Sequence, residues 1–76
     1  MLPLTVHFSP VTFSKSEIDF LTLLSSGYTD SEIAIVLNFS PTYIKTIVKR
    51  LVKKYRVVNR CHLVAFFVNS YYLTDD

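Results

Sequence analysis

Lysine and arginine side chains are concentrated in one short stretch of this 76-residue chain. Seven of its eight basic residues lie between Lys45 and Arg60, and no acidic residue interrupts them. Cations spaced along one element can neutralise phosphates, which is how many proteins hold nucleic acid. The net charge of +2 understates this concentration because the acidic residues lie elsewhere. The stretch therefore predicts a nucleic-acid-binding element.

No other set of residues favours catalysis or metal binding. Cys61 is the only cysteine, and His7 and His62 are the only histidines, so no metal-ligand spacing occurs. Glu17 and Glu32 are explained by helix capping, and the chain has neither a glycine-rich phosphate loop nor a paired nucleophile and base. We expect no enzymatic activity, no metal and no cofactor.

Helix-start and helix-stop residues divide the chain into four predicted helices. Capping boxes begin two of them, and Ser40-Pro41 and Asn59 begin the others. The expected helices run from Ser14 to Gly27, from Thr29 to Asn38, over about 41–54 and over about 60–72. Residues 1–12 alternate apolar and polar side chains around two prolines, which predicts a short extended arm. The fold class is therefore all-α, with the arm preceding one domain at residues 13–73.

The chain offers no segment for a membrane. Its longest apolar run, residues 63–68, is far shorter than the roughly 20 residues that span a bilayer. We expect no membrane partner.

The predicted third helix separates a core stripe from a basic face. At about 100° per residue, one narrow stripe is apolar; it holds Ile44, Val48, Leu51 and Tyr55. Lys45 and Lys49 are expected to contact phosphates, as is Lys53. Thr46 and Arg50 are better placed to reach base edges, and Arg is the commonest reader of guanine.

The order of these elements is that of a helix-turn-helix, which places its second helix in the DNA major groove. The most specific motifs are Leu23-Leu24-x-x-Gly27, Glu32-Ile33-Ala34-x-x-Leu37-x-x-Ser40, Ile44-Lys45 and Val57-x-Asn59-Arg60. Their joint spacing, over roughly residues 13–65, resembles the LuxR/GerE-type DNA-binding domain.

This resemblance implies a four-helix domain of a transcription regulator that binds double-stranded DNA. It implies that Lys45 meets the DNA backbone, that Glu32 braces the motif and that Asn59-Arg60 opens the last helix. The expected DNA-contacting residues are Thr42, Tyr43, Lys45, Thr46, Lys49, Arg50, Lys53 and Arg60. We expect a small stand-alone regulator in the bacterial cytoplasm, associated with the nucleoid.

Four positions depart from the family pattern. Tyr43 stands where the family usually has Thr, and Ile47 stands where it usually has His. Tyr55 replaces the usual Leu, and Arg56 stands where Gly is often found. The Tyr43 ring can contact a thymine methyl group, whereas Ile47 makes no polar contact. The DNA sequence that this chain reads therefore does not follow from the resemblance.

The last predicted helix is apolar almost all round, which indicates burial on more than one side. The family commonly dimerises through this helix, and we expect a homodimer interface at Leu63, Phe66, Phe67 and Tyr71. Alternatively, the arm folds back over it. A rival function is a protein–protein module that pairs with a larger LuxR-type regulator and modulates it without reading DNA.

Overall fold

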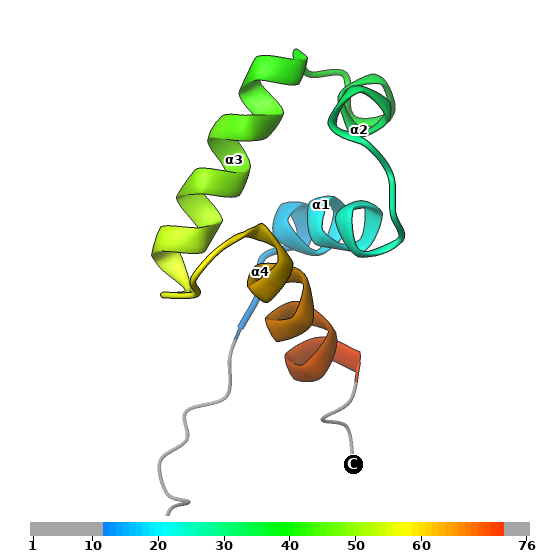
Figure 1. Cartoon of the computed structure of the whole chain (residues 1–76). Helices are drawn as coiled ribbons and strands as arrows, with labels where there is room; N and C mark the ends of the chain where they lie inside the picture. The colour runs from blue at the N-terminus through cyan, green and yellow to red at the C-terminus, as the bar shows by residue number, and fades with distance from the viewer. Residues whose placement is uncertain (1–11, 73–76) are drawn as a thin grey trace, which may run out of the picture.

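The structure is a computed structural model that describes residues 12–72, and this part of the chain is helical with short connections (Figure 1). The elements are α1 (Lys15–Ser25), α2 (Asp30–Leu37), α3 (Pro41–Lys54), α4 (Arg60–Phe67) and a π-helical turn, η1 (Val68–Tyr72). The all-α, four-helix prediction is confirmed. The last helix changes from α to π geometry at Val68, where a single helix was expected. The predicted arm lies outside the described residues, except for Thr12.

Local side-chain bonds begin each α-helix where the sequence predicts a start. At α1, Ser14 Oγ accepts the Glu17 N–H at 3.2 Å, and Glu17 Oε1 accepts the Ser14 N–H at 3.1 Å. Thr29 and Glu32 form the same reciprocal pair at α2. Each box satisfies two backbone donors that the first helical turn leaves free.

The starts of α3 and α4 use a different chemistry. Ser40 Oγ accepts the Tyr43 N–H at 3.2 Å, and Pro41 at the first position needs no partner for an N–H. Asn59 Oδ1 accepts the His62 N–H at 2.9 Å, while His62 Nδ1 accepts the Val58 N–H at 3.0 Å. His62 thus takes the place of the capping-box acid and serves the start of α4.

The ends of α1, α2 and α3 share one backbone arrangement. In each, one residue just past the end of the helix is left-handed; these residues are Gly27 (φ 92°), Asn38 (φ 63°) and Arg56 (φ 57°). The N–H of each left-handed residue bonds to the carbonyl three residues earlier, and the N–H of the residue that follows it bonds to the carbonyl five residues earlier. This pair of bonds defines a Schellman motif. Gly takes this conformation freely and Asn takes it readily, but for other L-residues it costs roughly 1–2 kcal/mol.

The core draws on all four α-helices. Ten apolar side chains of residues 12–72 are buried: Phe20, Leu21, Leu24, Ile33, Ala34, Ile44, Val48, Leu51, Leu63 and Phe67. The predicted stripe of α3 supplies three of them, and Ile47 and Val52, which flank the stripe, are half-buried against the core. In Figure 1, α3 lies along one side of the domain, so one of its faces points away from the other helices.

A polar contact fixes the N-terminal end of α1 against the C-terminal end of α3. Glu17 Oε1 accepts the Tyr55 hydroxyl at 2.7 Å, and Glu17 Oε2 pairs with the Lys54 ammonium. The Glu17 side chain is only 14% exposed. Burial raises the pKa of this carboxyl, but the bonds from Lys54, Tyr55 and the Ser14 N–H outweigh burial, so its pKa is lowered. One carboxylate therefore serves both a helix cap and a contact between helices.

The lowered pKa of Glu17 makes this contact sensitive to acid. Because the folded pKa lies below the unfolded value of about 4.5, the carboxylate stabilises the domain above that pH. The stabilisation fades as the pH falls through the folded pKa. We expect Glu17→Gln to reduce the free energy of unfolding at neutral pH by about 1–2 kcal/mol, since half-exposed Lys54 adds little. We also expect it to flatten the loss of stability on acidification, measured by urea unfolding from neutral pH to about pH 4.

Glu32→Gln is the control for this measurement, since it removes a capping carboxylate at neutral pH without touching α3. If the free energy of unfolding fell equally steeply with decreasing pH in the wild type and in Glu17→Gln, the acid sensitivity would not come from Glu17.

Candidate nucleic-acid interface

The face of α3 opposite the core carries four exposed residues at spacings of four, three and four: Thr42, Thr46, Lys49 and Lys53. Residues at these spacings share one helical face. Lys45 is also exposed and lies at the border of this face. We call these five residues the outer face of α3. It brings five of the eight predicted DNA contacts together.

The cations of the outer face have no acidic partner within residues 12–72. The ion pairs in this part of the chain are Lys15–Asp19, Lys54–Glu17 and Arg60–Asp30. Each uses a cation that is not on the outer face. The positive charge of Lys45, Lys49 and Lys53 is therefore not neutralised by any acidic side chain of residues 12–72.

The Thr46 hydroxyl already has a backbone partner. It donates to the Thr42 carbonyl, one turn earlier in α3, at 3.3 Å. Threonine commonly makes this bond inside helices. With its hydrogen engaged, Thr46 offers a ligand an acceptor oxygen and a methyl group rather than a donor.

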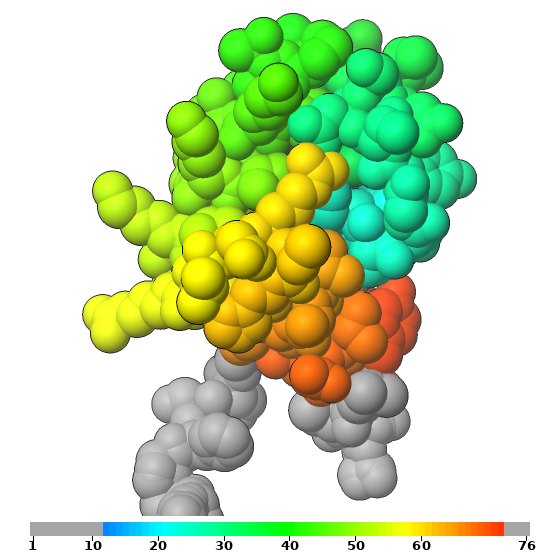
Figure 2. All heavy atoms as spheres, viewed as in Figure 1, coloured from blue at the N-terminus to red at the C-terminus, as the bar shows by residue number. Residues whose placement is uncertain are grey.

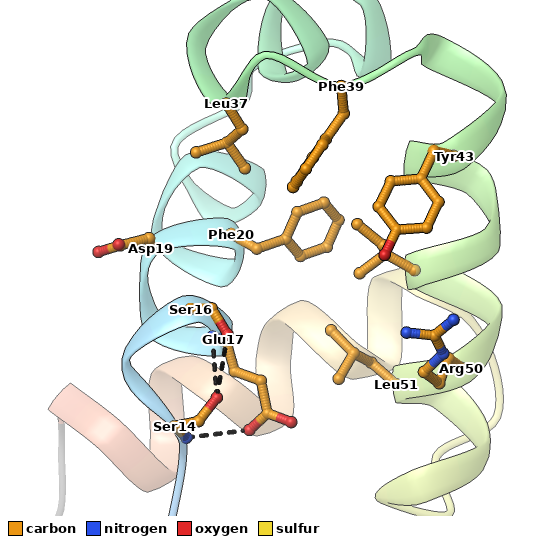
Figure 3. Close-up of a pocket in the computed structure, with 11 residues that line it drawn as sticks. Ser14, Ser16, Glu17, Asp19, Phe20, Leu37, Phe39, Tyr43, Arg50 and Leu51 are labelled. Atoms are coloured by element: carbon orange, nitrogen blue, oxygen red, sulfur yellow. Dashed lines mark hydrogen bonds between the residues drawn. The ribbon is translucent and has the colours of Figure 1, made fainter.

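Tyr43 and Arg50 lie on the edge of α3 that faces α1, together with Ile47. They line a groove of about 290 Å³ between α3 and α1 (Figure 3). The Tyr43 ring meets the Phe39 ring edge to face, with centroids 4.9 Å apart, and is 39% exposed. Phe20 of α1 forms part of the apolar lining. Tyr43 and Arg50 therefore line the groove and are also exposed at the protein surface.

Arg60 belongs to the scaffold rather than to the outer face. Its guanidinium lies 2.6 Å from Asp30 Oδ1, and the two side chains are 41% and 19% exposed. Asp30 Oδ1 is buried and has no hydrogen-bond donor of suitable geometry among the described residues, so Arg60 is its charge partner. The first residue of α4 is thereby tied to the first residue of α2, whereas the sequence assigned Arg60 only to contact with DNA.

The side chains expected at a dimer interface divide between the inside and the outside of the domain. Leu63 and Phe67 are fully buried in the core, so they are not available to a second copy, and that part of the prediction is corrected. Phe66 is half-buried, and Tyr71 is 43% exposed. Tyr71 stacks on Phe67 with centroids 5.1 Å apart, so the exposed ring rests directly on the core.

Residues 11–67, three quarters of the chain, match the family described as bacterial regulatory proteins, luxR family. The chain belongs to the LuxR family. The match covers α1 to α4 and ends at Phe67, the last residue of α4. No curated protein and no solved structure matches the chain.

Membership in the LuxR family identifies this chain as a DNA-binding regulatory protein, and the family's domain is not an enzyme. Double-stranded DNA is accordingly its partner. Within residues 12–72, no three His, Cys, Asp or Glu side chains are grouped to hold a metal ion. No helix in the same part of the chain is long and apolar enough to cross a membrane.

Sequence reasoning missed the two contacts that tie distant parts of this LuxR-family domain together. The sequence explains Glu17 by capping alone and gives Asp30 no partner. Glu17 meets Lys54 across 37 positions of sequence, and Asp30 meets Arg60 across 30. A capping box accounts for a glutamate locally, so nothing in the sequence signals its second partner.

The pairing of Arg60 with Asp30 predicts that the two residues are coupled in stability. We expect Arg60→Gln and Asp30→Asn each to lower the free energy of unfolding, because each leaves its partner unpaired. In a double-mutant cycle the coupling should be about 0.5–1 kcal/mol, as expected for a partly exposed pair. Thermal unfolding of the four proteins measures it. Additive effects would show that the pair does not hold α4 to α2.

Proposed function

We propose that this LuxR-family protein regulates transcription as a homodimer, with the outer face of α3 in the DNA major groove. We propose the bacterial cytoplasm, at the nucleoid, as the place where it acts. One observation carries the proposal. In the described domain, Lys15, Lys54 and Arg60 are paired with acids, whereas the three lysines of the outer face, Lys45, Lys49 and Lys53, are exposed and unpaired on one side of a single helix.

The residues of α3 have different roles in this proposal. The long, exposed lysines suit phosphates, which position a protein on DNA without reading its sequence. Thr42 and Thr46, on the same face, offer oxygens and methyl groups to base edges. Arg50 and Tyr43 lie on the edge of α3 that faces α1. They therefore reach the bases in the DNA major groove only if α3 is tilted toward that edge. Arg60 is left out because Asp30 engages it.

The proposal predicts that reversing a charge on the outer face disrupts DNA binding. We expect Lys49→Glu to weaken binding to mixed DNA fragments at least about tenfold, because a phosphate contact becomes a repulsion. Lys15→Glu is the matched control, since it makes the same change of charge at an exposed residue of α1. It should change the affinity by less than about threefold. Fluorescence anisotropy on labelled fragments measures both.

The salt dependence of binding counts the phosphates. Each neutralised phosphate contributes about −0.9 to the slope of log affinity against log salt. With Lys45, Lys49 and Lys53 each at a phosphate, the slope is about −2.7 for each bound copy. A flat slope, or no binding at all together with co-purification of a larger LuxR-type regulator, would favour the rival protein–protein module.

A group of aromatic side chains at the end of the domain supports the homodimer. Phe66, Tyr71 and Tyr72 are at least partly exposed and adjoin the buried Phe67. Phe13, just before α1, meets Phe66 with centroids 6.1 Å apart. Burying such rings against a second copy would remove a large apolar area from water. Two copies joined there would present two recognition helices to half-sites about one DNA turn apart, ~34 Å.

The homodimer predicts that a charge among these rings separates the two copies. We expect the wild type to scatter light as a dimer and Tyr71→Glu to scatter as a monomer, since a carboxylate would be buried unpaired in the interface. Ile35→Glu is the control because Ile35, on α2, is 81% exposed and lies outside this group. Circular dichroism melts confirm that both variants fold. A wild type that stays monomeric at tens of micromolar would overturn the dimer.

A further inference from the structure

Arg56 holds a backbone position that a smaller residue would hold with less strain. Three helices end with the same hydrogen-bond pattern, and the left-handed residue is Gly27 after α1, Asn38 after α2 and Arg56 after α3. Gly and Asn are the residues that adopt this conformation most easily. At the end of α3 a long side chain has been kept in spite of the strain, which points to a task for the side chain.

No contact within the described domain explains why an arginine side chain stands at position 56. Arg56 is exposed and has no acidic partner within the described residues. The backbone bonds of the turn, from the Arg56 N–H to the Lys53 carbonyl and from the Val57 N–H to the Val52 carbonyl, need no particular side chain at this position. Val57, half-buried against the core, is what anchors the turn.

A cation is also favourable at the C-terminal end of a helix, where the helix dipole is negative. Lys53 and Lys54 already supply two cations in the last turn of α3. This general effect therefore gives little reason to add a third cation in a strained conformation, and a specific ligand for Arg56 accounts for it better.

The position of Arg56 suits a ligand shared with the outer face of α3. Arg56 follows Lys53 by three residues, and its N–H bonds to the Lys53 carbonyl at 3.3 Å, so the two cations leave the backbone close together. In Figure 2, long side chains from the last turn of α3 and the turn after it extend away from the body of the domain. A guanidinium held in this way can donate two parallel bonds to one phosphate.

We propose that Arg56 contacts a DNA backbone phosphate and extends the outer face of α3 beyond the end of the helix. This inference rests on the proposed DNA-binding function. The left-handed turn directs the side chain away from the core, and the domain gives up some stability to keep a cation there.

The test compares Arg56→Gly with the wild type in DNA affinity, salt dependence and thermal stability. Arg56→Gly should weaken binding about threefold to tenfold at low salt and make the log–log salt slope shallower by about 0.9 for each copy. Its melting temperature should be equal to or above that of the wild type, because the strain is relieved. Arg56→Lys keeps the charge and should retain most of the affinity. Lys15→Gln, which removes a cation from α1, should leave affinity and slope unchanged.

The outcomes separate this inference from the function on which it rests. If the wild type does not bind DNA, both are wrong. If Lys49→Glu weakens binding while Arg56→Gly binds with the affinity and slope of the wild type, only the role of Arg56 is overturned. Arg56→Asn, which also suits the left-handed conformation, should behave as Arg56→Gly does. A fall in melting temperature in both variants would show that Arg56 supports the fold, and would overturn the inference.

Discussion

The structure depends on the requirement that α3 serve the core and the outer surface at once. Ile44, Val48 and Leu51 form a narrow stripe that enters a core supplied by the other three α-helices. Burial of three such side chains stabilises the helix in place by several kcal/mol, roughly 1.5–3 kcal/mol for each. Because so narrow a stripe secures the helix, the opposite face has no packing to satisfy and can carry charges that nothing in the described domain neutralises.

The acidic residues sort the cations into two groups. Glu17 draws Lys54 toward α1, and Asp30 draws Arg60 toward α2. Both acids also lie at helix starts, where a negative charge is favourable. Each therefore combines a local role with a long-range one. Because the acids lie there, the cations of the outer face have no acidic partner in the described domain. The basic stretch, which is continuous in sequence, therefore contains two cations that hold helices together, Lys54 and Arg60, and the unpaired cations of the outer face.

The local features of this fold could be predicted from the sequence, and the long-range ones could not. The helix starts at Ser14, Thr29 and Ser40 depend on capping residues within one turn, so the spacing of these residues in the sequence was enough to predict each start. The core stripe of α3 followed from a clear contrast between apolar and charged residues. In α4 that contrast is absent, because Phe66 and Phe67 are neighbours and equally apolar, so periodicity could not decide which one enters the core.

In the candidate site too, the sequence predicted the helix on which residues lie but not the neighbours that they contact. Sequence placed Tyr43 and Ile47, the two most conspicuous departures from the family pattern, on the helix expected to read DNA, but not on a particular edge of it. The structure places both beside the groove that faces α1, where the Tyr43 ring packs against Phe39. An aromatic ring and an aliphatic side chain suit that edge because they extend the apolar surface begun by Phe20. These departures therefore alter the contact between α3 and α1 and leave the charge of the outer face intact. The positive charge that would hold a phosphate backbone does not depend on them, whereas base reading from the Tyr43 edge does.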